Sequence, residues 1–221
     1  MKPRLSLIID DIGPSVFRAK LFSVLDIPMT FAVLPHFPKS EYLALEFHNA
    51  GHEIMLHQPM EPLNPEVDPG PGALYVGDGP DKIVKIMEKN IAAIPYATGV
   101  NNHMGSKFTT HQKEMHQTLE IVKGRGLFFI DSLTASDSKG YKTAKRLHMP
   151  SACRNIFLDN EPDARSILRQ LLRLADVGLC DGHAIGIGHP FPETAKAIKI
   201  FLKDFRDSGI KFVGVSQLVA E

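Results

Sequence analysis

Short apolar runs alternate with longer amphipathic segments along nearly the whole chain, and this alternation limits the available folds more than any other feature of the sequence. The apolar runs have the length of buried strands, whereas the segments between them carry apolar residues at helical spacing. Strands joined by helices in this order run parallel and are covered by helices on both faces. The predicted strands span residues 5–10, 29–34, 53–57, 98–102, 127–131, 155–158, 184–188 and 211–215.

The predicted helices fill the intervals between these strands. Gly51 and Gly209 predict where two of them end, because glycine readily adopts the left-handed conformation that follows a helix. No segment has the composition of a linker, so residues 1–221 are predicted to form a single domain. Two architectures fit, an open doubly wound sheet and a closed barrel of seven or eight strand–helix units. The helices are predicted over residues 16–25, 39–50, 81–94, 112–123, 163–176 and 193–207.

The charge balance of the chain argues against two classes of partner. Lysine plus arginine and aspartate plus glutamate both number 25, and the formal net charge is zero. Proteins that bind nucleic acids or anionic membrane surfaces carry a basic excess, which is missing here. The longest apolar runs are only as long as strands, so no transmembrane segment is predicted. Nothing before the first predicted strand resembles an export signal.

Residues 58–80 form a stretch rich in proline and glycine that interrupts the alternation. Proline lacks a backbone N–H and glycine has no side chain to pack, so this stretch is predicted to be neither helix nor central strand. Long loops inside compact domains are usually either functional or disordered. Because the stretch directly follows His57, it is predicted to overhang the site to which His57 belongs.

Polar side chains follow nearly every predicted strand at its carboxyl end. Parallel α/β folds place their sites at this edge of the sheet, so these residues are candidates for one common site. Asp10 and Asp11 most clearly require a neutralising partner, because adjacent carboxylates repel each other and are costly to bury without a cation. The others are Pro35-His36, His57, Asn101-Asn102-His103, Asp131-Ser132, Asp159-Asn160, His189 and Ser216-Gln217.

One aspartate and two histidines are a common ligand set for a divalent metal ion. Zinc binds neutral imidazole nitrogens and carboxylate oxygens, and catalytic zinc keeps one position open for water. Asp11, His57 and His103 follow three different predicted strands and would supply such a set. Asp10 would then lie beside the water that the metal activates, where a carboxylate acts as a general base.

The same arrangement requires a general acid on the other side of the substrate. His189 follows a later strand and would protonate the leaving group. Asp131 would orient this imidazole and keep it protonated, as a neighbouring carboxylate does.

Motifs in the same order along the chain resemble those of the polysaccharide deacetylase family, and most closely its divergent branch. The sequence IIDDIG resembles the family's Asp-Asp-Gly motif, which implies Asp10 as the catalytic base and Asp11 as a metal ligand. GHEIMLHQPME resembles the second motif and implies His57 as another ligand. FFIDS resembles the fourth motif, which gives Asp131, and IGIGHP resembles the fifth, whose histidine, here His189, acts as general acid.

This resemblance covers nearly the whole chain and implies a fold, a cofactor and a substrate. The fold would be a distorted (β/α)7–8 barrel of parallel strands. The cofactor would be a divalent metal ion, with zinc preferred, and the partner an acetylated glycan. The family also implies a location outside the cytoplasm.

Two motifs depart from the family pattern. The family places a second metal-binding histidine where Glu61 stands, and GVNNHMGSKF does not match the usual Arg-x-Pro-Tyr motif but contributes His103. Either Glu61 or His103 would therefore complete the ligand set. Imidazole suits zinc better than a second carboxylate does, which favours His103.

These residues favour a metal-dependent hydrolase that deacetylates a polysaccharide or oligosaccharide. Two alternatives remain. A metal-independent glycoside hydrolase on a related barrel would use two carboxyl groups roughly 5–10 Å apart. A glycan-binding protein whose site has lost its activity would explain the altered second and third motifs.

Overall fold

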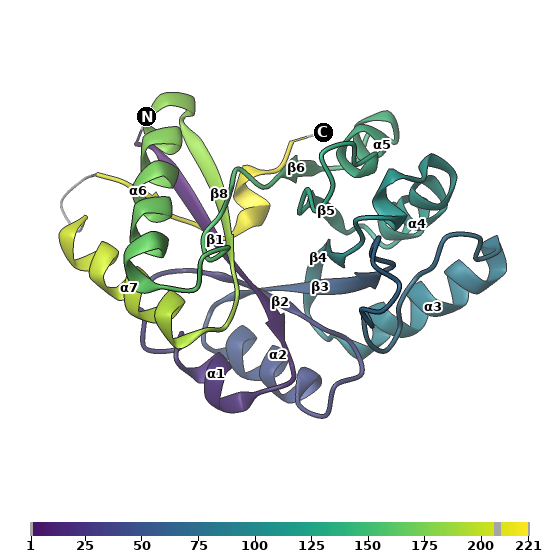
Figure 1. Ribbon diagram of the computed structural model, residues 1–221, viewed down its shortest axis with the longest axis horizontal. Helices are drawn as coiled ribbons and strands as arrows, with labels where there is room; N and C mark the ends of the chain where they lie inside the picture. Colours follow the sequence, from purple (N-terminus) through teal and green to yellow (C-terminus); the bar gives the residue numbers. More distant parts are fainter. Residues whose placement is uncertain (1, 206–208, 221) are drawn as a thin grey trace.

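A parallel sheet curled into an open barrel forms the centre of the computed structural model, which describes residues 2–205 and 209–220 (Figure 1). Its strands are β1 (Arg4–Ile12), β2 (Thr30–Val33), β3 (Glu53–Met60), β4 (Ala97–Met104), β5 (Phe128–Asp131), β6 (Ser151–Cys153), β7 (Ile156–Phe157), β8 (His183–Gly188) and β9 (Lys211–Phe212). They lie in the order β6-β5-β4-β3-β2-β1-β8-β7, and β9 pairs with β1 outside this path. The predicted distorted barrel of parallel strands is therefore confirmed.

Helices cover the outer face of this sheet (Figure 1). The helices α6 and α7 pack together beside β8, and α3 packs against α4 on the other side of the barrel. The α-helices are α1 (Val16–Lys20), α2 (Ser40–Asn49), α3 (Pro80–Ala93), α4 (Gln112–Gly124), α5 (Gly140–Arg146), α6 (Ala164–Asp181) and α7 (Pro192–Asp204), and two short 3-10 helices are η1 (Phe108–Thr110) and η2 (Val215–Leu218).

The two ends of the sheet are joined by a single stretch of chain. β6 pairs with β5 and β7 pairs with β8, and only Arg154 and Asn155 separate β6 from β7. The Arg154 N–H donates to the Asp131 carbonyl at 3.0 Å, and the Asn155 N–H donates to the Ile185 carbonyl at 2.9 Å. The chain therefore crosses the gap of the barrel while it is bonded to both sides.

Apolar side chains form one layer outside the sheet and a second layer inside it. Along β1, Leu5, Leu7 and Ile9 belong to the layer under the helices, whereas Ile8 belongs to the inner layer. This alternation is that of a strand with both faces buried. The C-terminal segment adds Val215 to the inner layer. Apolar packing thus closes the amino end of the barrel, and polar groups gather at the carboxyl end.

Ser216 and Gln217 lie at the amino end of the barrel, away from the other predicted strand ends. β9 pairs with the first two residues of β1. The Ser216 N–H donates to the carboxylate of Glu53, at the start of β3, at 3.1 Å. The prediction that Ser216 and Gln217 share the common edge is wrong, because β9 is too short to reach it and turns into η2.

Pro59 lies within β3 and does not end it. β2 pairs with β3 only as far as Leu56, and beyond it Leu74 pairs with Met60 on that side of β3. The Leu74 N–H donates to the Pro59 carbonyl at 3.0 Å and the Glu61 N–H donates to the Leu74 carbonyl at 2.9 Å, so neither bond uses the N–H that Pro59 lacks. The strand was predicted to end at His57, and this boundary is wrong because β3 continues to Met60.

Other differences from the prediction concern the ends of helices and elements that are very short. α1 is shorter than predicted and α6 is longer, whereas α5 and β6 were not predicted because elements this short show no periodicity. Gly51 follows α2 with a φ of 86°, as predicted. α7 ends at Asp204, and residues 206–207 of the predicted helix lie outside the described residues. Within the described ranges, no helix is both long and apolar enough to cross a membrane.

Candidate metal and acid–base site

Asp10 and Asp11 both reach the cavity at the carboxyl end because β1 carries an extra residue there. Ile9 pairs with Phe31, but the next partners are Ile12 and Val33, so β1 is one residue longer than β2 over this interval. Adjacent side chains of a regular strand point to opposite faces, and a bulge redirects one of them. The backbone accommodates the extra residue at Asp11, whose φ is 56°. Aspartate tolerates this left-handed conformation better than most residues do.

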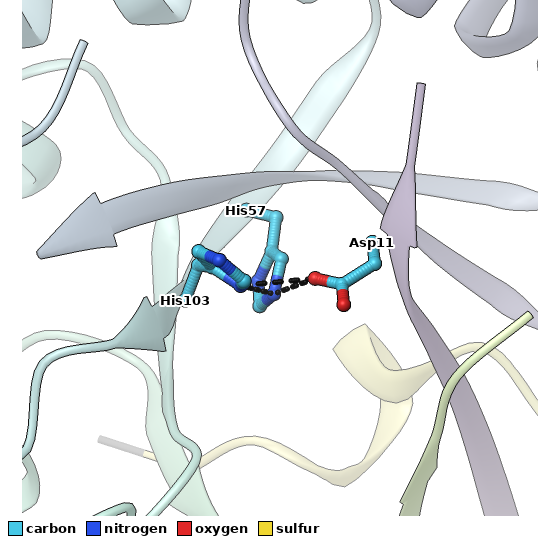
Figure 2. Close-up of side chains that lie close together, drawn as sticks. All are labelled: Asp11, His57 and His103. Carbon is cyan, nitrogen blue, oxygen red and sulfur yellow. Dashed lines mark hydrogen bonds and ion pairs between the residues drawn. The ribbon is translucent and has the colours of Figure 1, made fainter. Parts of the chain in front are cut away.

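Asp11, His57 and His103 converge from β1, β3 and β4 (Figure 2). Asp11 Oδ1 lies 2.9 Å from His103 Nδ1 and 3.2 Å from His57 Nε2. The two ring nitrogens are 3.1 Å apart. Burial alone would raise the pKa of Asp11, but the adjacent His103 and His57 imidazoles outweigh burial and hold that pKa below its usual range.

This donor set fits a divalent metal ion. Ligand atoms about 2.0–2.1 Å from one tetrahedral zinc lie roughly 3.3 Å from each other, close to the separations among Asp11, His57 and His103. Asp11 Oδ1 is also buried without a well-directed hydrogen bond, although both rings lie at short distance. The two ring nitrogens lie within hydrogen-bonding distance of each other, and together with the Asp11 oxygen they are close enough to be ligands of one ion.

Asn101 connects His57 to Asp10. Asn101 Oδ1 lies 2.8 Å from His57 Nδ1, so the ring donates through Nδ1 and turns the lone pair of Nε2 toward Asp11. Asn101 Nδ2 donates to Asp10 Oδ1 at 2.8 Å. This residue was predicted only as a polar strand end. Its role depends on its pairing opposite His57 in the β3–β4 register, which the sequence pattern does not specify.

Asp10 lies beside the triad and is almost fully buried. Its Oδ2 is 3.6 Å from His57 Nε2. Burial raises the pKa of Asp10 above that of an ordinary carboxyl, and the neighbouring His57 and His189 oppose this only in part. A carboxylate with a raised pKa accepts a proton more readily, so Asp10 is suited to act as a base near neutral pH.

His189 is supported by Asp159, not by Asp131 as predicted. His189 Nδ1 lies 2.8 Å from Asp159 Oδ1, and the His189 N–H donates to Asp159 Oδ2 at 2.6 Å. Phe157 pairs with Ile187 in the β7–β8 register, so the residues two positions further along each strand are also neighbours. The prediction for Asp131 is wrong because β5 does not pair with β8.

Asp131 instead binds the turn that leads into α5. Its carboxylate accepts hydrogen bonds from the Leu133 N–H at 2.9 Å, the Ser138 hydroxyl at 2.8 Å and the Tyr141 N–H at 2.9 Å. These bonds fix one wall of the barrel rim. They give Asp131 a structural role next to the site.

We expect Asp159→Asn to lower the pKa of His189. Burial lowers this pKa, but the Asp159 carboxylate outweighs burial and raises the pKa of His189 to about 9. An amide at position 159 removes that charge. The imidazole signals of the metal-free protein, followed by NMR against pH, would report the change. Asp131→Asn is the control: a larger shift from Asp131→Asn than from Asp159→Asn would contradict the assignment.

The same shift predicts how stability depends on pH. The folded-state pKa of His189, about 9, exceeds the value of about 6.5 for an unfolded histidine. Protonation of His189 therefore stabilises the fold fully below about pH 6.5, and this contribution is lost as pH rises through about 9. Asp159→Asn should remove most of that dependence from the thermal unfolding midpoint measured across this range.

Glu61 is held away from the triad. Glu61 Oε1 lies 2.7 Å from Lys107 Nζ, and Glu61 Oε2 accepts the Val76 N–H at 2.7 Å. Between the two predicted candidates for the third ligand, the structure thus brings His103 and not Glu61 to Asp11 and His57. His36, another predicted strand end, is also elsewhere, with its Nε2 2.8 Å from Asn90 Oδ1.

A cavity of about 280 Å³ gives access to these groups. The stretch of residues 58–80 was predicted to overhang this site, but none of its residues lines the cavity. Phe157 forms one wall, with the Arg154 guanidinium 3.7 Å from the centre of its ring. The lining residues are Asp10, Asp11, His57, Asn102, His103, Met104, Ser132, Thr134, Phe157 and His189.

A parallel barrel that presents an Asp-His-His set, a buried carboxylate and a histidine supported by aspartate is typical of metal-dependent hydrolases. The model of the divergent polysaccharide deacetylase family matches residues 7–219. The chain belongs to this family, and its fold is the barrel of polysaccharide deacetylases.

The chain is similar to the following known proteins. The uncharacterized protein YibQ of Escherichia coli (strain K12) is 31% identical over 196 residues, which are 89% of this chain and 61% of YibQ. The crystal structure of the uncharacterized protein ATU2773 from Agrobacterium tumefaciens C58 is 29% identical, with a TM-score of 0.93 over 99% of this chain and 89% of that one. The T48 deacetylase, solved with its substrate, shares the fold at 17% identity, with a TM-score of 0.61 over 98% and 90%.

Proposed function

We propose that this protein is a metal-dependent hydrolase that removes acetyl groups from a polysaccharide or oligosaccharide. The observation that carries the proposal is the meeting of three groups in one cavity. These are the Asp11, His57 and His103 triad, the buried carboxylate of Asp10, and the imidazole of His189. Acyl hydrolysis by this route needs a metal site, a general base and a general acid, and each group provides one of them. The substrate class is proposed from the family.

Asp11, His57 and His103 would hold the ion, which we propose to be zinc. When bound, zinc supplies a Lewis acid that polarises the acyl oxygen and acidifies water. Asp10 takes the proton of the water whose oxygen forms the new bond to the acyl carbon. His189 gives a proton to the amine or alcohol as its bond to that carbon breaks. General acid–base steps of this kind contribute about 10²–10⁴-fold each.

The cavity size favours a small acyl group as the part of the substrate that enters. At about 280 Å³, the cavity is at the low end of ligand pockets, which span about 300–1,000 Å³. It can take an acetyl group with part of one sugar ring, and the rest of the glycan would lie across the rim. We place this activity outside the cytoplasm, which fractionation of cells that express the protein from its native gene would test.

We expect EDTA to abolish acetate release from acetylated oligosaccharides and added zinc to restore it. The measurement is acetate released from N-acetylated and O-acetylated oligosaccharides, with new reducing ends counted in parallel. New reducing ends that form unaffected by EDTA would identify a glycoside hydrolase instead. Zinc binding without acetate release from any of these sugars would favour a glycan-binding protein.

A further inference from the structure

We propose that Asn101 is a positioning residue that assigns His57 and Asp10 their separate roles, one as ligand and the other as base. Among the residues that the structure describes, its side chain is the one that hydrogen-bonds to both, and it is fully buried. The inference rests on the proposed hydrolase function, because it concerns how that site is set up.

The amide of Asn101 can satisfy its two neighbours in one orientation only. Its oxygen accepts and its nitrogen donates. The carboxylate of Asp10 can only accept when ionised, so the nitrogen must face Asp10, and the oxygen then faces His57 Nδ1. Turning the amide over would place two acceptors against each other at Asp10. A third contact, from Asn101 Nδ2 to Ser132 Oγ at 3.4 Å, agrees with this orientation.

This orientation selects the tautomer of His57. With Nδ1–H donated to Asn101, Nε2 carries the free lone pair and faces Asp11 Oδ1 and His103 Nδ1. A partner on the outer nitrogen of a ligating histidine fixes both the ring and the tautomer, and removing it typically weakens metal binding about 10–100-fold. The amide oxygen of Asn101 therefore fixes the orientation and the tautomer of His57.

The amide nitrogen of Asn101 orients the proposed base, Asp10. Asn101 Nδ2 engages Oδ1 of Asp10, which leaves Oδ2 as the oxygen closer to the triad. A neutral amide does this without adding charge. An aspartate at position 101 would keep the acceptor for His57 but would place a second carboxylate against Asp10, and two such groups share a proton. The two functions of Asn101 can therefore be separated by substitution.

We expect Asn101→Ala and Asn101→Asp to behave differently. Asn101→Ala should weaken zinc affinity about 10–100-fold and also lower kcat. Asn101→Asp should retain zinc affinity near the wild-type value and lower kcat by about 10²-fold or more, because the base is impaired. Zinc affinity is measured by competition with a chromophoric chelator, and kcat by acetate release. Asn90→Ala, which removes another buried amide away from the triad, should lower the melting temperature without changing zinc affinity.

Parallel losses of zinc affinity, kcat and thermal stability in both Asn101 variants would overturn the inference and leave Asn101 a structural residue. A measurement on the wild-type protein does not depend on variants that fold. The ¹⁵N imidazole spectrum of the zinc-loaded protein should show His57 protonated at Nδ1, and protonation at Nε2 would overturn the inference. If the wild type binds zinc but hydrolyses no acetylated sugar, the hydrolase proposal fails, and the zinc affinities of the two variants still decide the ligand half of the inference.

Discussion

Asp10→Asn should lower kcat for acetate release by about 10²–10⁴-fold while the protein still binds zinc. Asparagine has the shape of aspartate, and its oxygen can still accept the hydrogen bond from Asn101 Nδ2 that now reaches Asp10 Oδ1. It cannot take a proton from water at neutral pH. The ligand atoms of Asp11, His57 and His103 are unchanged. Initial rates at saturating substrate, together with zinc affinity from chelator competition, would test this.

Stability provides the control for this substitution. Burial raises the folded-state pKa of Asp10, so above that pKa the ionised carboxylate destabilises the fold relative to the unfolded chain. Removing the charge should therefore leave the metal-free protein at pH 7 as stable as the wild type or more stable. Full turnover in Asp10→Asn would show that another group is the base, and a large drop in melting temperature would show that lost activity reflects unfolding.

His103→Ala should weaken zinc binding by more than about 100-fold, beyond the loss caused by removing a partner outside the ligand set. His103 Nδ1 is 2.9 Å from Asp11 Oδ1 and 3.1 Å from His57 Nε2, so without it the proposed zinc site would have two protein ligands. Activity at limiting zinc should fall with it. Isothermal titration with zinc and acetate release at several zinc concentrations would measure both effects.

Glu61→Gln is the matched control for His103→Ala. Glu61 is the residue at the family's histidine position, but its two oxygens are engaged by Lys107 and by the Val76 N–H. We therefore expect Glu61→Gln to keep zinc affinity unchanged and to affect only the anchoring of the neighbouring loop. Loss of zinc binding in Glu61→Gln with retention in His103→Ala would reverse the ligand assignment.

The polar residues at the carboxyl ends of the predicted strands were predictable from the sequence. Asp10, Asp11, His57 and His189 follow apolar runs, whereas His103 follows the weakly apolar segment TGVNN, and parallel strands carry all of them to one edge. The structure places all five around one cavity. Their roles in catalysis remain predictions for the experiments above.

The partners of these residues depended on strand order and register, which hydrophobic patterns do not encode. Asp131 and Asp159 both follow predicted strands, and only the pairing of β7 with β8 decides that Asp159 meets His189. Asn101 bonds to His57 because β4 lies beside β3 in a particular register. Ser216 was misplaced because β9 runs along the start of β1.

The extra residue in β1 makes the site depend on the length of the chain as well as on its chemistry. Asp10 and Asp11 share a cavity only because three steps from Ile9 to Ile12 match two steps from Phe31 to Val33. Deleting Asp10 or Asp11 would let β1 pair evenly with β2 and would leave one carboxylate at this end of the strand. A homologue could therefore retain every apolar residue of this strand, and with them the barrel, and still lose the site through a single codon deletion.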